Sequence, residues 1–165
     1  MRLNFTRASK EDIDEICALA DDVIVRYEDF NTIDREKALG WTHMSISQNI
    51  ERFAVIRADG HKAGYLLMTP GNGRYEINHL YILPYYQNKG IGTAVIRQCI
   101  KETEGNLQVY VFTGDLSTYG VFESLGFKTQ EVYHRTRYLM VYAGHEENVD
   151  MEEEYDAQFA IGGER

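Results

Sequence analysis

Two glycines, Gly90 and Gly92, open an apolar helical pattern and could bind an anion there. Without side chains at this point, the free N–H groups of the first helical turn can lie against a ligand at the positive end of the helix dipole. Such a site suits a phosphate or a pyrophosphate. The spacing excludes two familiar phosphate loops, because neither the Gly-Lys-Ser/Thr ending nor the third glycine of the dinucleotide fingerprint is present. A purely structural turn is the alternative interpretation.

Two stretches resemble the signature motifs of one enzyme family. Residues 87–92, Gln-Asn-Lys-Gly-Ile-Gly, together with the preceding strand, resemble the Gln/Arg-x-x-Gly-x-Gly/Ala loop of the GNAT N-acetyltransferase superfamily. Residues 122–127, Phe-Glu-Ser-Leu-Gly-Phe, resemble the Tyr-Glu-x-x-Gly-Phe signature that closes the last helix of that family. Two motifs in the right order are more specific than either one. The resemblance is at motif level for residues 76–127, and the order of elements extends it to roughly residues 2–143.

The resemblance implies that the anion is the pyrophosphate of acetyl-CoA. Lys89 or Arg97 would add positive charge, and pantetheine would run along the preceding strand with Ile82 as its main-chain partner. The residues implied to bind the cofactor are Leu80, Ile82, Gln87, Asn88, Lys89, Gly90, Ile91, Gly92, Thr93, Asp115 and Phe122.

Acyl transfer to an amine needs a neutral amine, a donor for the developing oxyanion and a proton for the leaving thiolate. The resemblance assigns the oxyanion contact to the backbone N–H of Leu80. It assigns the base to Glu76, six residues before Ile82. In a regular strand Glu76 and Leu80 share a face, although a bulge would change that parity. His79 or Tyr81 acting through water is the competing base.

The proton donor is where this sequence departs from the family pattern. Phe122 stands where members commonly have a tyrosine, and a phenyl ring cannot donate a proton. Tyr119 lies three residues earlier, on the same helix face, and is the predicted substitute. Asp115 replaces a common asparagine at the start of this helix.

Hydrophobic periodicity and turn residues predict the order β-α-α-β-β-β-α-β-α-β-β. This order agrees with the α+β fold that the resemblance implies, a central, mostly antiparallel mixed sheet of about seven strands flanked by about four helices. The predicted strands are residues 3–7, 53–58, 62–69, 74–83, 107–112, 127–132 and 137–142. The predicted helices follow a cap at Ser9 and span about 34–50, 91–103 and 116–125. Tyr27, Phe30 and Trp41 are either core aromatics or contacts of the acceptor.

Length and composition suit one domain, predicted over residues 1–144, followed by an acidic, mobile tail over 145–165. The tail holds eight acids and one base, which accounts for −7 of the net charge of −9. A nearly neutral body without a Lys/Arg cluster predicts no binding to nucleic acid or to a membrane surface. Cys17 and Cys99 are expected to be reduced thiols, and no metal site is expected. The absence of a signal-like or spanning segment predicts a cytoplasmic protein.

The sequence therefore predicts an N-acetyltransferase. It would transfer an acetyl group from acetyl-CoA to a primary amine of a small molecule or peptide by direct attack in a ternary complex, as a monomer or homodimer. The alternatives are a noncatalytic acyl-CoA-binding or regulatory module and a structural domain without a cofactor. The acceptor pocket falls on weakly patterned segments, so the acceptor is not predicted.

Overall fold

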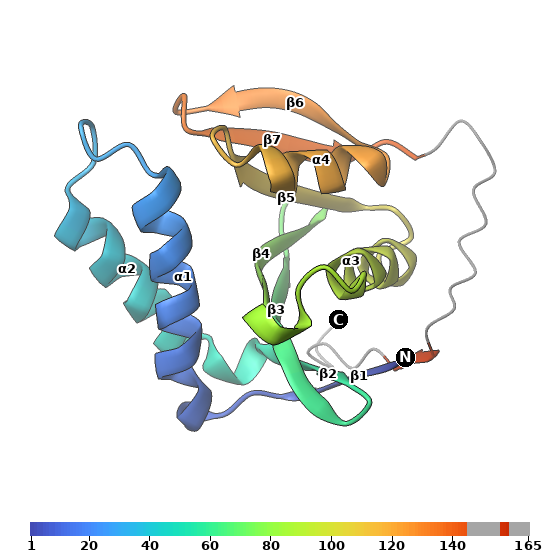
Figure 1. Cartoon of the computed structure of the whole chain (residues 1–165). Helices are drawn as coiled ribbons and strands as arrows, with labels where there is room; N and C mark the ends of the chain where they lie inside the picture. Colours follow the sequence, from blue (N-terminus) through green and yellow to red (C-terminus); the bar gives the residue numbers. More distant parts are fainter. Residues whose placement is uncertain (145–155, 159–165) are drawn as a thin grey trace.

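The computed structural model describes residues 1–144 and 156–158. The predicted order of elements is confirmed (Figure 1). The strands are β1 (Arg2–Arg7), β2 (Ala54–Ala58), β3 (His61–Pro70), β4 (Tyr75–Ile82), β5 (Leu107–Phe112), β6 (Phe127–Tyr133), β7 (Arg137–Tyr142) and β8 (Asp156–Gln158). The helices are α1 (Ile13–Tyr27), α2 (Arg35–Gln48), α3 (Ile91–Glu102) and α4 (Leu116–Ser124), with short 3-10 turns η1 (Lys10–Asp12), η2 (Ile50–Arg52) and η3 (Pro84–Tyr86).

All the strands belong to one mixed sheet with the order β6-β7-β5-β4-β3-β2-β1-β8. Strands β1 to β4 form an antiparallel meander, and β5 lies parallel to β4. Strand β7 is antiparallel to both β5 and β6. The predicted mobile tail lies outside the described residues except for β8, which pairs parallel to β1.

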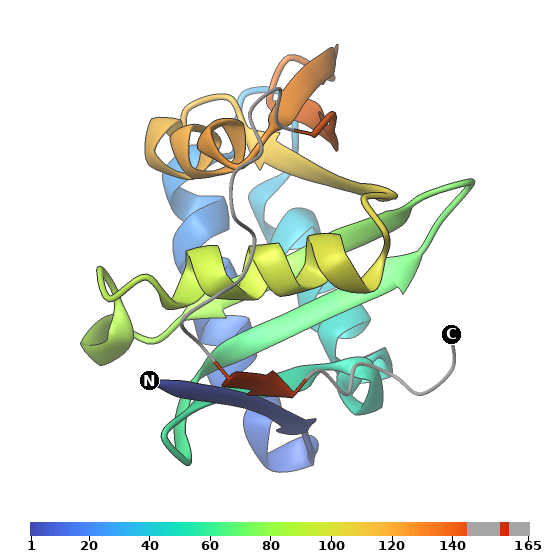
Figure 2. The ribbon, with the colours of Figure 1, turned by 90° about the vertical axis from the view of Figure 1, so that its right-hand side faces the viewer.

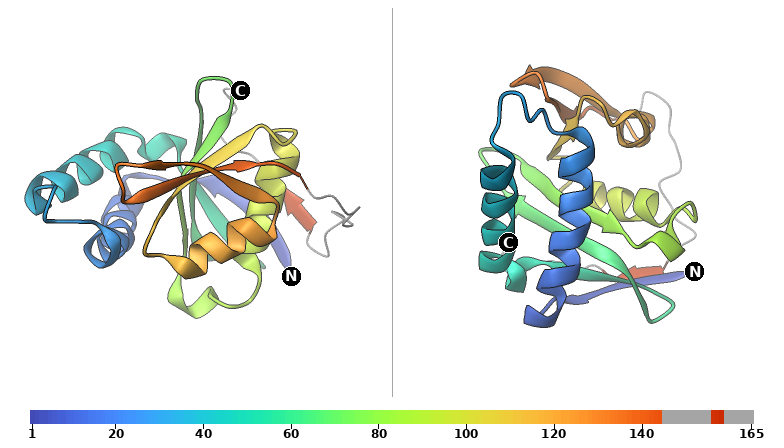
Figure 3. Two further views of the ribbon diagram at one scale, coloured as in Figure 1. Left: turned by 90° about the horizontal axis from the view of Figure 1, so that it is seen from above. Right: turned by 60° about the vertical axis from the view of Figure 1, so that its left-hand side comes forward.

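Helices cover both faces of this sheet, so the fold has three layers. Helices α3 and α4 pack on one face through apolar side chains that include Val95, Ile96 and Phe122 (Figure 2). Helices α1 and α2 lie side by side on the other face, where Ile16 and Ile46 pack against the sheet (Figure 3, right). The two layers therefore have separate apolar cores.

Carboxylates and tight turns begin and end these elements as the sequence suggests. The backbone N–H of Ser9 donates to Asp12 Oδ2 at 2.9 Å before α1, and Asp34 Oδ1 accepts from the N–H of Lys37 at 2.9 Å at the start of α2. Asp59 and Gly60 join β2 to β3 and have φ angles of 51° and 85°, the left-handed values that a tight two-residue hairpin turn requires. None of the described helices is long and apolar enough to cross a membrane.

Two neighbouring parallel strands share only a short ladder, and this positions the site. Strand β4 pairs with β5 from Tyr75 to Ile77, although it stays paired with β3 as far as Ile82. Beyond Ile77 the edge of β4 that faces β5 is not paired with it, and β5 continues along β7. The sheet therefore opens between its two central strands.

Candidate active site

A cavity of about 680 Å³ lies at the opening between β4 and β5. Both strands line it, β4 from Glu76 to Tyr81 and β5 from Val109 to Phe112. On the α3 and α4 side, Thr118 and Phe122 contribute to the wall. On the other side the wall comes from α1, α2, η2, β3 and the first residue of β7. The cavity thus passes through the sheet and connects the two helical layers.

A β-bulge at Asn78 decides which main-chain groups of β4 face this opening. His79 pairs with Leu67 and Ile77 pairs with Met68, so no residue of β3 lies level with Asn78 in the ladder. Before the bulge, the N–H of Tyr75 donates across to Asn106 O at 2.8 Å, on the β5 side. After it, the N–H of Leu83 donates to Ala63 O at 2.8 Å, on the β3 side. Since N–H groups alternate along a strand, the N–H groups of residues 80 and 82 point to the open side.

The bulge also changes the direction of the side chains, and the predicted placement of Glu76 beside Leu80 is wrong. Ile77 and Leu80 both pack on the α3 side of the sheet, whereas Tyr81 packs on the α1 side. Glu76 alternates with Ile77 and therefore lies on the α1 side, across the sheet from the side chain of Leu80. Glu76 still lines the same cavity as Leu80, because the cavity opens to both faces.

Two amides hold the Glu76 carboxylate, one on each oxygen. Gln108 donates from Nε2 to Oε1 at 3.0 Å, and Asn78 donates from Nδ2 to Oε2 at 3.0 Å. Asn78 is itself held by Thr69, whose hydroxyl donates to Asn78 Oδ1 at 2.7 Å. These bonds orient the carboxylate at the wall of the cavity. Gln108 was not among the residues predicted from the sequence, because its place level with Glu76 follows from the pairing of β4 with β5.

The competing base pair, His79 and Tyr81, forms a buried polar contact on the same wall. His79 Nδ1 and Tyr81 Oη are 2.7 Å apart, and the His79 ring packs at 5.4 Å from the ring of Phe53. Burial lowers the pKa of His79 to about 4, so the imidazole is neutral at pH 7. Burial, together with the neighbouring Cys17 and Asp21, raises the pKa of Tyr81, which keeps its proton. A neutral imidazole with so low a pKa is a weak base at pH 7.

The glycine turn precedes α3 as predicted and provides free donors. Gly90 is the N-cap of α3 and has a left-handed conformation with φ of 81°, and Asn88 is also left-handed with φ of 61°. The first helical hydrogen bond runs from the N–H of Ala94 to Gly90 O at 3.0 Å, so the N–H groups of residues 91–93 have no partner within the helix. Gly92 has a helical conformation, and a Cβ there would lie 3.7 Å from Ile82 Cγ1, an ordinary contact.

Other predicted cofactor residues lie around this turn and along α4. Gln87 donates from Nε2 to the carbonyl oxygen of Ile82 at 3.0 Å, which links the turn to the end of β4. Lys89 is exposed, and its Nζ lies 5.1 Å from the centre of the Tyr85 ring. Asp115 caps α4 by accepting from the N–H of Thr118 at 3.1 Å and from its hydroxyl at 2.7 Å. Asp115 and Phe122 both line the cavity.

The structure does not bring Tyr119 to the cavity. Asp115, Thr118 and Phe122 share the stripe of α4 that lines it, and Tyr119 is not among the lining residues. The Tyr119 hydroxyl lies 2.9 Å from Thr129 Oγ1, and its ring packs edge-on at 5.1 Å from the ring of Tyr138. The predicted role of Tyr119 as proton donor therefore has no support in this geometry. Phe122 faces the cavity, whereas Tyr119 faces Thr129 of β6 and Tyr138 of β7.

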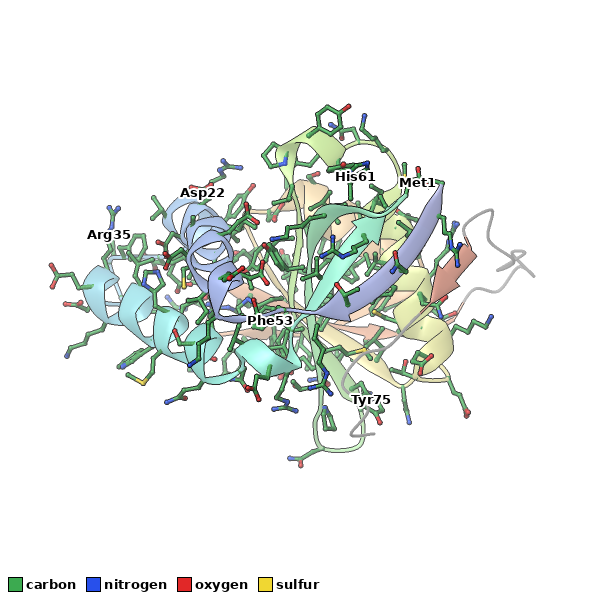
Figure 4. All side chains as sticks on the ribbon, turned by 90° about the horizontal axis from the view of Figure 1, so that it is seen from below. Met1, Asp22, Arg35, Phe53, His61 and Tyr75 are labelled. Atoms are coloured by element: carbon green, nitrogen blue, oxygen red, sulfur yellow. The ribbon has the colours of Figure 1, made fainter. Side chains whose placement is uncertain are left out.

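The aromatic residues of the first two helices have different surroundings. Tyr27 stacks on Phe112 with ring centres 6.2 Å apart, at the end of the cavity. Phe30 lies against the guanidinium of Arg35, and Trp41 is 64% exposed. Neither Phe30 nor Trp41 is in the core or in the cavity wall. The labelled Arg35 and Asp22 lie on the outer side of the two helices, away from Phe53, which lies next to the sheet (Figure 4).

The protein is thus a three-layer domain whose sheet opens between two parallel strands beside a glycine turn that begins a helix. The particular family follows from the sequence. The profile of the Acetyltransferase (GNAT) family matches residues 16–127, which is more than half of the chain. The chain therefore belongs to the GNAT acetyltransferase family. No curated protein sequence matches it significantly.

Several solved structures share the fold. An N-acetyltransferase from Staphylococcus aureus superposes with a TM-score of 0.63 at 12% identity, over 83% of this chain and 98% of that one. The PaiA N-acetyltransferase from Thermoplasma acidophilum, solved in complex with coenzyme A, gives 0.57 at 19% identity, over 85% and 98%. N-acetylglutamate synthase from Neisseria gonorrhoeae, complexed with coenzyme A and L-arginine, gives 0.61 at 19%, over 87% of this chain and 34% of that one. At these identities the likeness concerns the fold.

Proposed function

We propose that this protein is an acetyl-CoA-dependent N-acetyltransferase that acetylates a primary amine by direct attack within a ternary complex. The observation that carries the proposal is the N–H of Leu80, which points from the bulged strand into the opening beside β5. A fixed N–H at such an opening stabilises an oxygen that becomes negatively charged during acyl transfer. Membership of the GNAT acetyltransferase family supports the same reaction.

The glycine turn and the open edge of β4 suit the two parts of the cofactor. The free N–H groups of residues 91–93 would bind the pyrophosphate of acetyl-CoA at the N-terminus of α3. The unpaired edge of β4 would accept pantetheine as though it were another strand, which brings the thioester to Leu80. A protein of similar fold, the PaiA N-acetyltransferase, was solved with coenzyme A bound.

The chemistry requires one proton to leave the amine and one to reach the sulfur. The amine nitrogen attacks the thioester carbonyl, the new N–C bond forms, and the C–S bond then breaks. Glu76, held by Gln108 and Asn78 on the other side of the opening, accepts the amine proton directly or through a water molecule. Water delivers a proton to the thiolate, since Tyr119 lies away from the cavity.

One observation favours a second candidate, a noncatalytic acyl-CoA-binding module. The family position that commonly holds a tyrosine is Phe122, and the nearest tyrosine on α4, Tyr119, is bonded to Thr129 instead. No tyrosine of α4 therefore lines the described cavity. In this candidate the protein binds the cofactor and turns none of it over.

Two measurements separate these candidates. Titration with coenzyme A should raise the melting temperature of the protein, because a ligand that binds the native state stabilises it. Incubation with acetyl-CoA and a panel of primary amines should release free thiol in an amine-dependent way. Thermal stabilisation without amine-dependent thiol release would favour the noncatalytic module. Lack of any response to coenzyme A would overturn both candidates.

A further inference from the structure

The residues that the C-terminal half of α2 and the following turn present to the cavity are all polar. Thr42, Ser45 and Asn49 recur at helical spacing and line the cavity, and Arg52 of η2 continues the same stripe three residues later. The neighbouring stripe, with Ile46 and Ile50, is buried in the core. The polar stripe is therefore the part of α2 that meets whatever occupies the cavity.

Besides the neutral His79, four charged side chains line the cavity, and three of them have strong partners among the described residues. Arg137 donates from Nη2 to Glu28 Oε2 at 2.9 Å, and the Glu28 side chain is 2% exposed. Asp115 accepts two hydrogen bonds from Thr118. Glu76 accepts one amide hydrogen on each oxygen.

Arg52 is the exception in this set. Its one hydrogen bond in the described part of the chain runs from Nη1 to Asn49 Oδ1 at 3.4 Å, which is long and involves a neutral acceptor. No described carboxylate forms an ion pair with it. Most of the planar donor fork of Arg52 is therefore available to a ligand in the cavity.

Arg52 and Glu76 lie at the same end of the sheet. Arg52 ends η2, two residues before β2 begins at Ala54, which is level with Leu66 of β3. Thr69 is level with Glu76 across β3 and β4. Strand β3 lies between the start of β2 and Glu76 on β4, and both Arg52 and Glu76 line the shared cavity. A positive and a negative group face the same small volume.

We propose that the acceptor is an amine that also carries a carboxylate, and that Arg52 binds this carboxylate. The amine would lie toward Glu76 and Leu80, and the carboxylate would occupy the guanidinium fork, a pairing that arginine favours over other cations because it can be bidentate. This inference rests on the proposed acetyltransferase activity and specifies its substrate class. An amino acid carries both groups, an amine for the side of Glu76 and a carboxylate for Arg52.

The test uses pairs of acceptors that differ by one carboxylate: lysine and cadaverine, tyrosine and tyramine, β-alanine and ethylamine. For each pair the ratio of kcat/KM, carboxylate-bearing amine over its decarboxylated partner, is measured with the native chain and with Arg52→Gln. Members of a pair differ in amine basicity, so a ratio for one protein is not decisive. Dividing the native ratio by the variant ratio cancels this intrinsic difference.

We expect the native ratio to exceed the Arg52→Gln ratio by about 10- to 100-fold for at least one pair, the size of a hydrogen-bonded charge contact. The change should be in KM, with kcat nearly constant, because the carboxylate lies away from the reacting atoms. Arg52→Lys should keep part of the ratio, and Arg52→Glu should favour the decarboxylated amines. The matched control is Arg57→Gln, since Arg57 lies on β2 outside the cavity and bonds to Thr6 at 3.1 Å.

Two outcomes overturn the inference and leave the proposed function standing. One is that the amines are turned over but the ratio of kcat/KM, carboxylate-bearing amine over its decarboxylated partner, is the same in the native chain and in Arg52→Gln. The other is turnover restricted to amines without a carboxylate. If coenzyme A binds but no pair is turned over, amino acids should still stabilise the coenzyme A complex against heat more than their decarboxylated partners do, through Arg52. Absence of that difference also overturns the inference, whereas failure to bind coenzyme A overturns the proposed function itself.

Discussion

The two sides of the opening between β4 and β5 are built in different ways. On the α3 side the important groups are main-chain N–H groups, presented by a short turn that is contiguous in sequence with β4. On the α1 side they are side chains from separate elements: Glu76 and Asn78 of β4, Gln108 of β5, and Arg52 of η2. A binding site formed by main-chain groups of one turn can be identified from a short sequence motif. A wall formed by side chains from separate elements can be identified only once the sheet is assembled.

The two sides also differ in what a substitution can disturb. The glycine turn is exposed and depends on local backbone conformation, whereas the Glu76 cluster depends on the register between β3, β4 and β5. Changes at the turn should therefore affect cofactor binding with little effect on stability. Changes in the register should disturb both sides together.

The largest effect on stability at neutral pH is expected at Gly64, where a side chain on β3 would meet the main chain of β4. A Cβ on Gly64 would overlap the carbonyl oxygen of Tyr81, a backbone atom that cannot move without displacing β4. We expect Gly64→Ala to lower the free energy of unfolding by roughly 3 kcal/mol, measured by urea denaturation. Gly120→Ala is the matched control, because a Cβ at Gly120 meets nothing within 4 Å and the residue lies within α4. Equal stability of the two variants would show that β4 is not held as described.

The next effect concerns Glu76 and tests the α1 side alone. We expect Glu76→Gln to lower turnover by about 100- to 10,000-fold, the usual loss of a general base, and to leave coenzyme A affinity unchanged. The loss should shrink as the pH rises, because more of the amine is then already neutral. Steady-state kinetics at several pH values measure both effects. Glu123→Gln, on the exposed part of α4, serves as control, and native turnover by Glu76→Gln would remove Glu76 from the mechanism.

His79 predicts a pH dependence of stability from the same wall. Burial lowers its pKa in the folded state to about 4, below the ordinary value of 6.5, so the unfolded chain binds the proton more tightly. Stability should therefore be complete above pH 6.5 and fall by roughly 3 kcal/mol as the pH drops to about 4. Urea denaturation of the native chain and of His79→Gln at pH 7 and 4.5 measures this contribution. An identical loss in both proteins would assign the dependence to other groups.

Asp12 changes its contribution to the free energy of unfolding at a lower pH than His79 does. It therefore does not interfere with the denaturation experiment on His79. Burial alone would raise the pKa of Asp12, but hydrogen bonds from Lys62 at 2.6 Å, from the N–H of Ser9 and from Tyr65 outweigh burial and lower it below 3.8. The stability that Asp12 contributes is present above its unfolded pKa and is lost as the pH falls through the folded one. This loss begins where that of His79 is nearly complete.

A smaller effect separates the two glycines of the cofactor turn. We expect Gly90→Val to weaken coenzyme A binding by about tenfold or more, because a β-branched residue strongly disfavours the left-handed φ of 81° and would alter the turn. Gly92→Ala should fold normally, since its Cβ makes an ordinary contact with Ile82. Isothermal titration with coenzyme A measures both variants. Unchanged affinity in a folded Gly90→Val protein would contradict the pyrophosphate site.

The smallest effect is expected at Tyr119. Because its hydroxyl is bonded to Thr129 and its ring packs on Tyr138, we expect Tyr119→Phe to change turnover by less than about threefold, a difference below 1 kcal/mol. The thiol-release assay described above measures it. A large loss of turnover would mean that α4 rotates Tyr119 into the cavity when the cofactor binds.

Local sequence determined most of the architecture. Strands β5 and β7 have the predicted bounds, and the other helix and strand ends differ by a few residues, because apolar periodicity and capping residues act over short distances. The same holds for the turn at Gly90, whose left-handed conformation is a property of one residue and its neighbours. These features need no information about distant parts of the chain.

Which side chains and main-chain groups line the cavity depends on the tertiary structure. The bulge at Asn78 arises from how β4 pairs with β3, and it alone moved Glu76 to the opposite face from Leu80 and turned the N–H of Leu80 toward the opening. The helical twist of α4 separated Tyr119 from Phe122, and the packing of α2 brought Arg52 to the wall. Pairing register and helix rotation depend on contacts between residues far apart in the chain, so hydrophobic pattern and motif spacing did not determine them.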